Sequence, residues 1–287
     1  MAHPFVFACI APHGLPIIPE LAQPDVESMA KTRGSMVQLG QMMRDARPET
    51  IIVLTPHGLR VDGQFSVVDA SFMSGRLSER TVAAMVGESR LDDGAVVQMT
   101  RLVDRDLAKA IIATAAQAQL PVASLNFQTS EGVFSDLPLD WGVMVPLYFM
   151  PDVPIVVLTP SRKLSYEQHR DFGRVMADAV HQSGKRVGLI ASCDWSHTHA
   201  AEGPYGLHED AAKLDAQVVT LLQRNDFEAM TEFDSTFIEN AKPDGIWQSL
   251  MLAGAIHPED RQITVLSYEA PTYFGLICAA IRPRIGK

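Results

Sequence analysis

The sequence is poor in cysteine, and its three cysteines fit neither of the common cysteine-based frameworks. Cys9, Cys193 and Cys278 are odd in number, lie far apart and form no Cys-x-x-Cys pair. Disulfide scaffolds need an even set of cysteines, and cysteine zinc sites need closely spaced ones. The pattern therefore argues against both classes, and we expect a cytoplasmic protein.

Basic residues and long apolar runs are also scarce. The chain has 24 Lys and Arg against 34 Asp and Glu, a net charge of −10 at pH 7. Nucleic acids and anionic membranes attract basic surfaces, so we expect neither as a partner. No apolar run reaches the ~18 residues of a membrane span. The apolar N-terminal run, only about seven residues long, lacks the basic region of a signal peptide.

What the chain does contain is 47% hydrophobic residues in a length of 287, enough for a substantial core. Short β-branched runs alternate with helical patterns, which predicts an α/β fold in one domain. The predicted strands lie at about 5–11, 50–54, 64–70, 121–125, 154–159, 186–192, 262–268 and 273–281. The predicted helices lie at about 25–45, 94–119, 164–181, 209–222 and 246–255, with an irregular polar region at about 70–89.

Two of the predicted strands end in the same tripeptide. Pro12-His13-Gly14 follows the first strand and Pro56-His57-Gly58 follows the second. A single histidine at a strand end is usually only a turn residue, but the recurrence favours a shared metal or catalytic site. The helix at 25–45 would connect the strands as a βαβ unit, so the strands are parallel and both histidines reach the same sheet edge.

A third histidine follows the buried strand at 186–192, in the sequence Cys193-Asp194-Trp195-Ser196-His197. Three imidazoles at one sheet edge, with carboxylates nearby, admit two chemistries. Three histidines and a water suit a hydrolytic zinc ion, whereas two histidines and one carboxylate suit non-haem Fe(II). The spacing alone leaves both open.

The ordered set of motifs resembles the class III extradiol ring-cleaving dioxygenases, the LigB-like family named after the β subunit of protocatechuate 4,5-dioxygenase. The resemblance covers most of the chain. It implies a single catalytic domain over residues 1–287, a three-layer α/β/α sandwich with a largely parallel or mixed central sheet. The motifs that carry it are Ala11-Pro12-His13 with Pro19-Glu20, Thr55-Pro56-His57-Gly58, Asp194-Trp195-Ser196-His197, Gly203-Pro204-Tyr205-Gly206, and Glu239 with Ala253-Gly254-Ala255.

The resemblance also implies roles for individual residues. His13, His57 and Glu239 would ligate Fe(II), and His197 would be the uncoordinated acid/base. Asp244 is the alternative carboxylate. We predict Glu239 because glutamate has the longer reach, and because Asp244 is a plausible N-terminal cap of the helix that follows it.

The chain departs from the family at one position. Many members have Asp-His-Gly where this chain has Asp140-Trp141-Gly142. The missing histidine is thought to hydrogen-bond substrate or oxygen, so its replacement affects the expected rate or substrate. We expect Trp141 and Tyr205 to contact an aromatic ring instead.

The function that the resemblance implies is O2-dependent cleavage of a catecholic or aminophenolic ring, a reaction of aromatic compound catabolism. The expected partners are a small aromatic substrate, O2 and further copies of the chain in a homo-oligomer. Two alternatives stay open. One is a Memo-like binding or redox protein on the same fold, which a cysteine in place of the carboxylate would favour; the other is a metal-dependent hydrolase.

Overall fold

The parallel strands that carry the histidines lie at the centre of a large mixed sheet in this computed structural model, which describes residues 4–22, 26–85 and 88–284. The eight strands follow the order β10-β11-β1-β9-β2-β8-β3-β6. The central four are parallel: β1 (Phe7–Ala11), β9 (Val187–Ser192), β2 (Thr50–Leu54) and β8 (Ile155–Thr159). The outer strands are β10 (Arg261–Glu269), β11 (Leu276–Pro283), β3 (Phe65–Val68) and β6 (Val122–Leu125).

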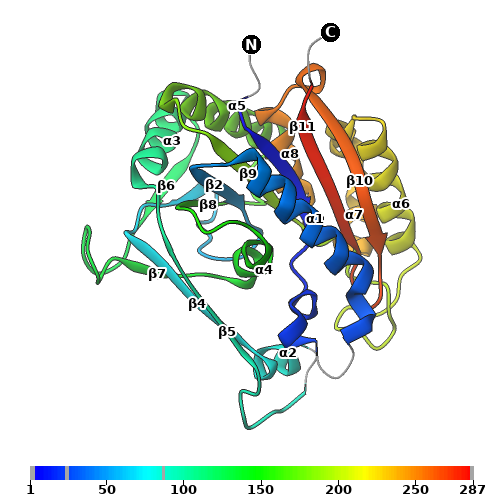
Figure 1. Cartoon of the computed structure of the whole chain (residues 1–287). Helices are drawn as coiled ribbons and strands as arrows, with labels where there is room; N and C mark the ends of the chain where they lie inside the picture. Colours follow the sequence, from blue (N-terminus) through cyan, green and yellow to red (C-terminus); the bar gives the residue numbers. More distant parts are fainter. Residues whose placement is uncertain (1–3, 23–25, 86–87, 285–287) are drawn as a thin grey trace.

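Every residue of the four central strands is buried, because helices cover both faces of the sheet. On one face, α1 (Ala30–Ala46) and α4 (Trp141–Phe149) contribute to one core cluster. On the other, α3 (Arg105–Gln117), α5 (Tyr166–Ser183), α6 (Asp210–Gln223) and α8 (Ile246–Ala255) contribute to a second (Figure 1). The expected α/β fold, with helices on both faces of a mixed sheet, is confirmed.

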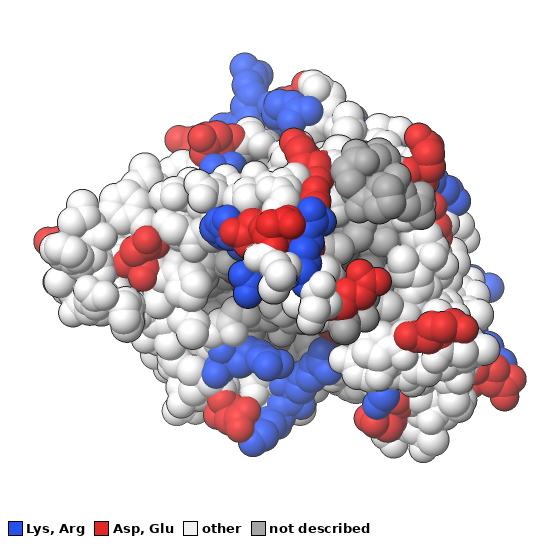
Figure 2. All heavy atoms as spheres, turned by 90° about the horizontal axis from the view of Figure 1, so that it is seen from below, with Lys and Arg blue, Asp and Glu red and all other residues white. Residues whose placement is uncertain are grey.

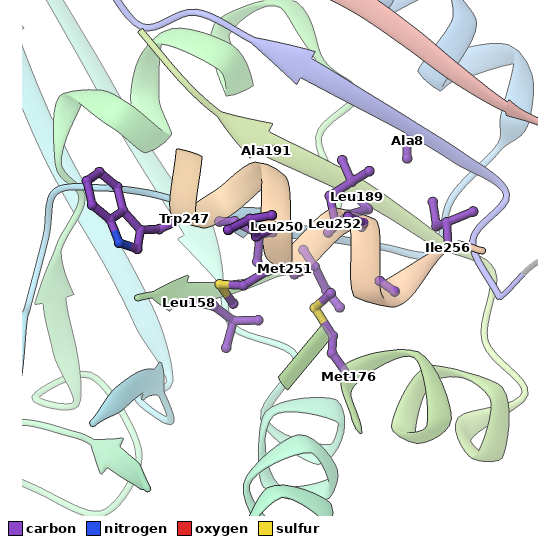
Figure 3. Close-up of a cluster of buried hydrophobic side chains, with 14 of the residues drawn as sticks. Ala8, Leu158, Met176, Leu189, Ala191, Trp247, Leu250, Met251, Leu252 and Ile256 are labelled. Carbon is purple, nitrogen blue, oxygen red and sulfur yellow. The ribbon is translucent and has the colours of Figure 1, made fainter. Parts of the chain in front are cut away.

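Helix α8 packs tightly between the sheet and α5. Its side chains Leu250 and Met251 lie among Leu158 and Leu189 of the sheet (Figure 3). On the α5 side, a Cβ atom added at Gly254 would collide with the main-chain carbonyl of Arg170. The two backbones therefore approach as closely as glycine allows, which fixes α8 in place.

A second, three-stranded sheet was not predicted. It contains β4 (Phe72–Ser78), β5 (Val96–Leu102) and β7 (Asp136–Pro138), and α2 (Glu79–Met85) follows β4. The helix predicted at 94–119 is wrong in its first third. Side chains of β5 alternate between exposed and more buried positions around the buried Met99, which is the two-residue period of a strand.

The remaining elements are short. The segment after His13 forms two 3-10 turns, η1 (Leu15–Ile17) and η2 (Pro19–Leu21). The others are η3 (Val26–Met29), η4 (Phe227–Glu232), α7 (Ser235–Ala241) and η5 (Pro258–Asp260). Within the described ranges, no helix combines the length and the apolar character that spanning a membrane requires.

Candidate metal centre

His13 and His57 meet at the carboxyl edge of the central strands, as their positions after β1 and β2 predicted. The Nε2 atoms of the two rings lie 3.2 Å apart. The ring centroids are 4.9 Å apart, and the planes are nearly perpendicular, at 85°. Both nitrogens can therefore face one ion between them.

Asp244 completes the cluster. Its Oδ2 lies 3.2 Å from Nε2 of His13 and 3.8 Å from Nε2 of His57. One donor atom from each of the three residues lies within 4.8 Å of the others. Among the described residues, these three form the group that could hold a metal ion. Two imidazoles and one carboxylate form the donor set of a facial metal site, with the remaining positions left open.

The structure does not bring Glu239 to this cluster, which corrects the choice of carboxylate. Glu239 lies on the short helix α7, its side chain is 78% exposed, and Oε1 pairs with Nζ of Lys242 at 2.6 Å. Lys242 then adopts a left-handed backbone conformation at φ 54°, and the chain turns inward to Asp244. Side-chain reach was therefore the wrong criterion, because the backbone decides which carboxylate faces the histidines.

The capping role expected for Asp244 is also wrong. The cap of α8 is Gly245, and no side chain caps that end of the helix. Oδ1 of Asp244 instead accepts a hydrogen bond from the main-chain N–H of Asp194 at 2.9 Å, which leaves Oδ2 directed to the histidines. A Cβ added at Gly245 would lie 2.7 Å from Cβ of Cys193, so glycine lets the start of α8 press against the end of β9.

Hydrogen bonds orient the ring of His13. Its Nδ1 lies 2.9 Å from Oγ of Ser192, and that hydroxyl donates to the carbonyl of Gly142 at 2.5 Å. Because the hydroxyl proton is committed to Gly142, Ser192 accepts from Nδ1 of His13. Nδ1 therefore carries a proton, and Nε2 is the nitrogen free to bind a metal.

Electrostatics separate the two histidines. Burial lowers the pKa of His13, but the carboxylates of Asp194 and Asp244 outweigh burial and raise that pKa to about 9. Burial, reinforced by the charge of His13, lowers the pKa of His57 to about 3. Without a metal, His13 is thus the cation of the cluster, beside the carboxylates of Asp194 and Asp244. A bound metal ion would supply the positive charge in its place.

Trp141 lies against His57, with ring centroids 4.1 Å apart at 34°. It begins α4 after Asp140, whose Oδ1 accepts a hydrogen bond from Oγ1 of Thr55 at 3.0 Å. A Cβ added at Gly142 would lie 2.5 Å from Oγ1 of Thr55 and 3.2 Å from the His57 ring, so glycine makes room for this arrangement. Trp141 therefore forms a wall of the site.

His197 lies in the same pocket but outside the three-residue cluster. Its Nδ1 lies 2.9 Å from the carbonyl oxygen of Lys242, which can only accept. Nδ1 must therefore be the donor, and Nε2 of a neutral His197 keeps the lone pair of a base. The turn that supports His197 is the one that carries Asp244.

A cavity of about 280 Å³ lies beside the cluster. Aromatic side chains form part of its walls, and the ring of Phe274 lies 5.8 Å from that of His197 at 28°. Trp141, Tyr205 and Tyr273 also line the cavity, so the structure places both predicted substrate contacts there. The cavity has the size and the apolar character of a pocket for a small aromatic molecule.

A buried carboxylate that the sequence analysis missed holds the His197 segment. Asp215 of α6 is fully buried and accepts from the N–H of Ser196 at 3.0 Å. Its other oxygen lies 2.8 Å from Nε2 of His199 and 3.1 Å from the hydroxyl of Tyr268. Nothing in the helical pattern around Asp215 marks it, because its partners come from distant segments.

The chain is similar to known proteins in both sequence and fold. A curated relative, Protein CA_C1420 of Clostridium acetobutylicum, is 24% identical over 264 residues. The match covers 91% of this chain and 54% of the relative, so the chain spans about half the length of that relative. A crystal structure of the uncharacterized protein JW3007 from Escherichia coli K12 has a TM-score of 0.59 at 15% identity, covering 96% of this chain and 98% of the other. It shows a shared fold.

A match to a protein-family model identifies the family of the chain. Residues 7–277 match the catalytic LigB subunit of aromatic ring-opening dioxygenase. The matched range includes both strand-end histidines, His197 and Asp244. The chain belongs to the LigB family of aromatic ring-opening dioxygenase catalytic subunits.

Proposed function

We propose that the protein is an Fe(II)-dependent extradiol dioxygenase that cleaves a catecholic or aminophenolic ring with O2. The observation that carries the proposal is the convergence of His13, His57 and Asp244 beside an aromatic-lined cavity. A donor set of two histidines and one carboxylate leaves room for a bidentate substrate and O2. Fe(II) held there would supply the Lewis acidity that lowers the pKa of the substrate hydroxyls and the electron transfer that lets O2 react with the ring.

The side chains around the cluster have separate tasks in this proposal. Trp141 and Phe274 hold the aromatic ring between them and keep water away from it. Nε2 of His197 accepts the proton of a ring hydroxyl, because Nδ1 is already committed to the carbonyl of Lys242. Ser192 keeps His13 in the tautomer that exposes Nε2 to the metal.

The two alternatives predict different chemistry at the same residues. A Memo-like protein was expected to have a cysteine in the third position, and that position is occupied by Asp244. A three-histidine zinc hydrolase would need His197 in the cluster, but His197 is not part of the group of three. These observations support the dioxygenase. A hydrolase that used His13, His57 and Asp244 with water would require an experiment to distinguish it.

That experiment compares metals and substrates directly. Protein purified without added metal is analysed for metal content, loaded anaerobically with Fe(II) or Zn(II), and mixed with a panel of catechols and aminophenols. We expect O2 uptake equal to substrate consumed, with a ring-opened product, for the iron-loaded protein alone. Hydrolytic activity of the zinc-loaded protein without O2 uptake by the iron-loaded protein would contradict the proposal.

A further inference from the structure

Asp215 of α6 is the least exposed of the four buried aspartates in the described part of the chain; the others are Asp104, Asp194 and Asp244. Figure 2 shows many Asp and Glu side chains at the surface on one face of the molecule. A buried carboxylate destabilises a fold unless hydrogen bonds and opposite charge compensate for its lost hydration. The partners of Asp215 therefore show what this carboxylate holds in place.

Three donors surround the carboxylate of Asp215. Oδ1 accepts from the main-chain N–H of Ser196, and Oδ2 lies within hydrogen-bonding distance of Nε2 of His199 and the hydroxyl of Tyr268. An ionised carboxylate can only accept, so all three partners donate. Burial, reinforced by the charge of Asp215, raises the pKa of Tyr268, so this hydroxyl keeps its proton.

Gly275 makes room for this carboxylate. A Cβ atom added at Gly275 would collide with Oδ2 of Asp215. The main-chain N–H of Gly275 also donates to the carbonyl of Ser196 at 2.9 Å. Ser196 is therefore held at both of its main-chain polar groups, by Asp215 at the N–H and by Gly275 at the carbonyl.

The residues that Asp215 holds lie on both sides of His197. Ser196 precedes His197 directly, and His199 follows two positions later. Nδ1 of His197 lies 2.9 Å from the carbonyl of Lys242. His197 lines the cavity beside the metal centre, and Asp215 is not among the described residues that line it. Asp215 thus fixes the segment that carries His197 to the cavity and does not face the cavity itself.

We infer that Asp215 is a positioning residue for His197. The inference rests on the proposed function for the task of His197, which is to accept a proton from the substrate. A general base acts only within hydrogen-bonding distance of that proton, and a misplacement of ~1 Å can cost about 100-fold in rate. Asparagine at position 215 keeps the size of the side chain but has one acceptor oxygen and one NH2 donor, so it cannot accept at both sites.

The first measurement is a double-mutant cycle on the iron-loaded protein. Asp215→Asn should lower kcat for ring opening of catechol about 10- to 100-fold. Its iron content and its anaerobic affinity for catechol should change by less than about 3-fold. In a His197→Ala protein, the same substitution should change kcat by less than about 3-fold, because no base is left to position. An equal loss in both backgrounds would show a purely structural role and overturn the inference.

Tyr268→Phe is the matched control, since it removes one hydrogen bond from Asp215 and leaves the bonds to Ser196 and His199 in place. It should keep kcat within about 3-fold of the wild type. A loss as large as that of Asp215→Asn would overturn the inference. If Asp215→Asn fails to fold, His199→Ala replaces it and should lower kcat about 10-fold in the wild type but not in the His197→Ala protein.

The second measurement needs no turnover. Zinc-loaded protein labelled with 15N-histidine is diamagnetic, and NMR identifies the ring signals of His197 by their absence from His197→Ala. The wild type should show a single tautomer with the proton on Nδ1, fixed by the carbonyl of Lys242. Asp215→Asn should show averaged or broadened ring signals. Unchanged His197 signals in this variant would overturn the inference.

Together the measurements separate this inference from the proposed function. His197 signals that depend on Asp215, in a protein that cleaves no catechol or aminophenol, would refute the dioxygenase and keep the positioning role. Ring cleavage with a kcat and His197 signals that do not depend on Asp215 would support the dioxygenase and refute the positioning role.

Discussion

Oδ2 of Asp244 lies 3.2 Å from Nε2 of His13, although 231 positions separate the two residues in the sequence. The other candidate carboxylate, Glu239, points to solvent. We expect Asp244→Ala to retain no iron after desalting, because the remaining two imidazoles offer no anionic donor. Glu239→Ala is the matched control and should keep the iron stoichiometry of the wild type. Iron measured on both purified variants checks this, and the reverse result would restore Glu239 as the ligand.

Substitution of His197 should separate catalysis from metal binding. His197→Ala is expected to keep its iron, since His197 is outside the cluster of three. Turnover should fall roughly 100- to 10,000-fold, the usual cost of losing a general acid/base. His181→Ala, at the exposed end of α5, is the control and should leave both quantities unchanged. Loss of iron from His197→Ala would make His197 a ligand and favour the three-histidine alternative.

The stability of the metal-free protein should depend on pH through the two clustered histidines. His13 has its pKa raised from 6.5 to about 9, so its contribution is complete below pH 6.5 and is lost as the pH rises through 9. His57 has its pKa lowered from 6.5 to about 3, so its contribution is complete above pH 6.5 and is lost as the pH falls toward 3. Together they favour a maximum near pH 6.5.

Urea unfolding in the presence of a chelator, repeated across this pH range, measures the effect. His13→Asn should remove the part of the decline between pH 6.5 and 9 that His13 causes. His57→Asn should leave that alkaline decline in place. An identical alkaline decline in wild type and His13→Asn would show that His13 is not the responsible group.

The surroundings of two helical glycines predict opposite effects when each is replaced by alanine. Gly254→Ala should cost about 1–3 kcal/mol or more, because its Cβ would collide with the backbone of Arg170. Gly34→Ala, in the first half of α1 with open space around it, should stabilise the protein by roughly 0.5–1 kcal/mol. Chemical unfolding of both variants checks the signs. Equal effects would mean that α5 and α8 are not in close backbone contact.

The position of two of the candidate ligands was determined by local sequence. Each buried strand stops at Pro-His-Gly, and parallel strands joined by a helix must end at the same edge, so His13 and His57 were expected to meet. His197 was found in the same way, after the buried strand β9, whereas Trp141 was identified through the family resemblance. Short-range pattern and the handedness of βαβ units contain that information.

The third candidate ligand could be identified only from the tertiary structure. Glu239 and Asp244 are close in sequence, and side-chain length does not reveal direction. The left-handed turn at Lys242 and the packing of α8 against the sheet carry Asp244 inward, and α7 leaves Glu239 in solvent. The same is true of β5, which is a strand because it pairs with β4, and that pairing is a long-range contact. Contacts between segments that are distant in sequence determine these positions, so a local sequence pattern cannot predict them.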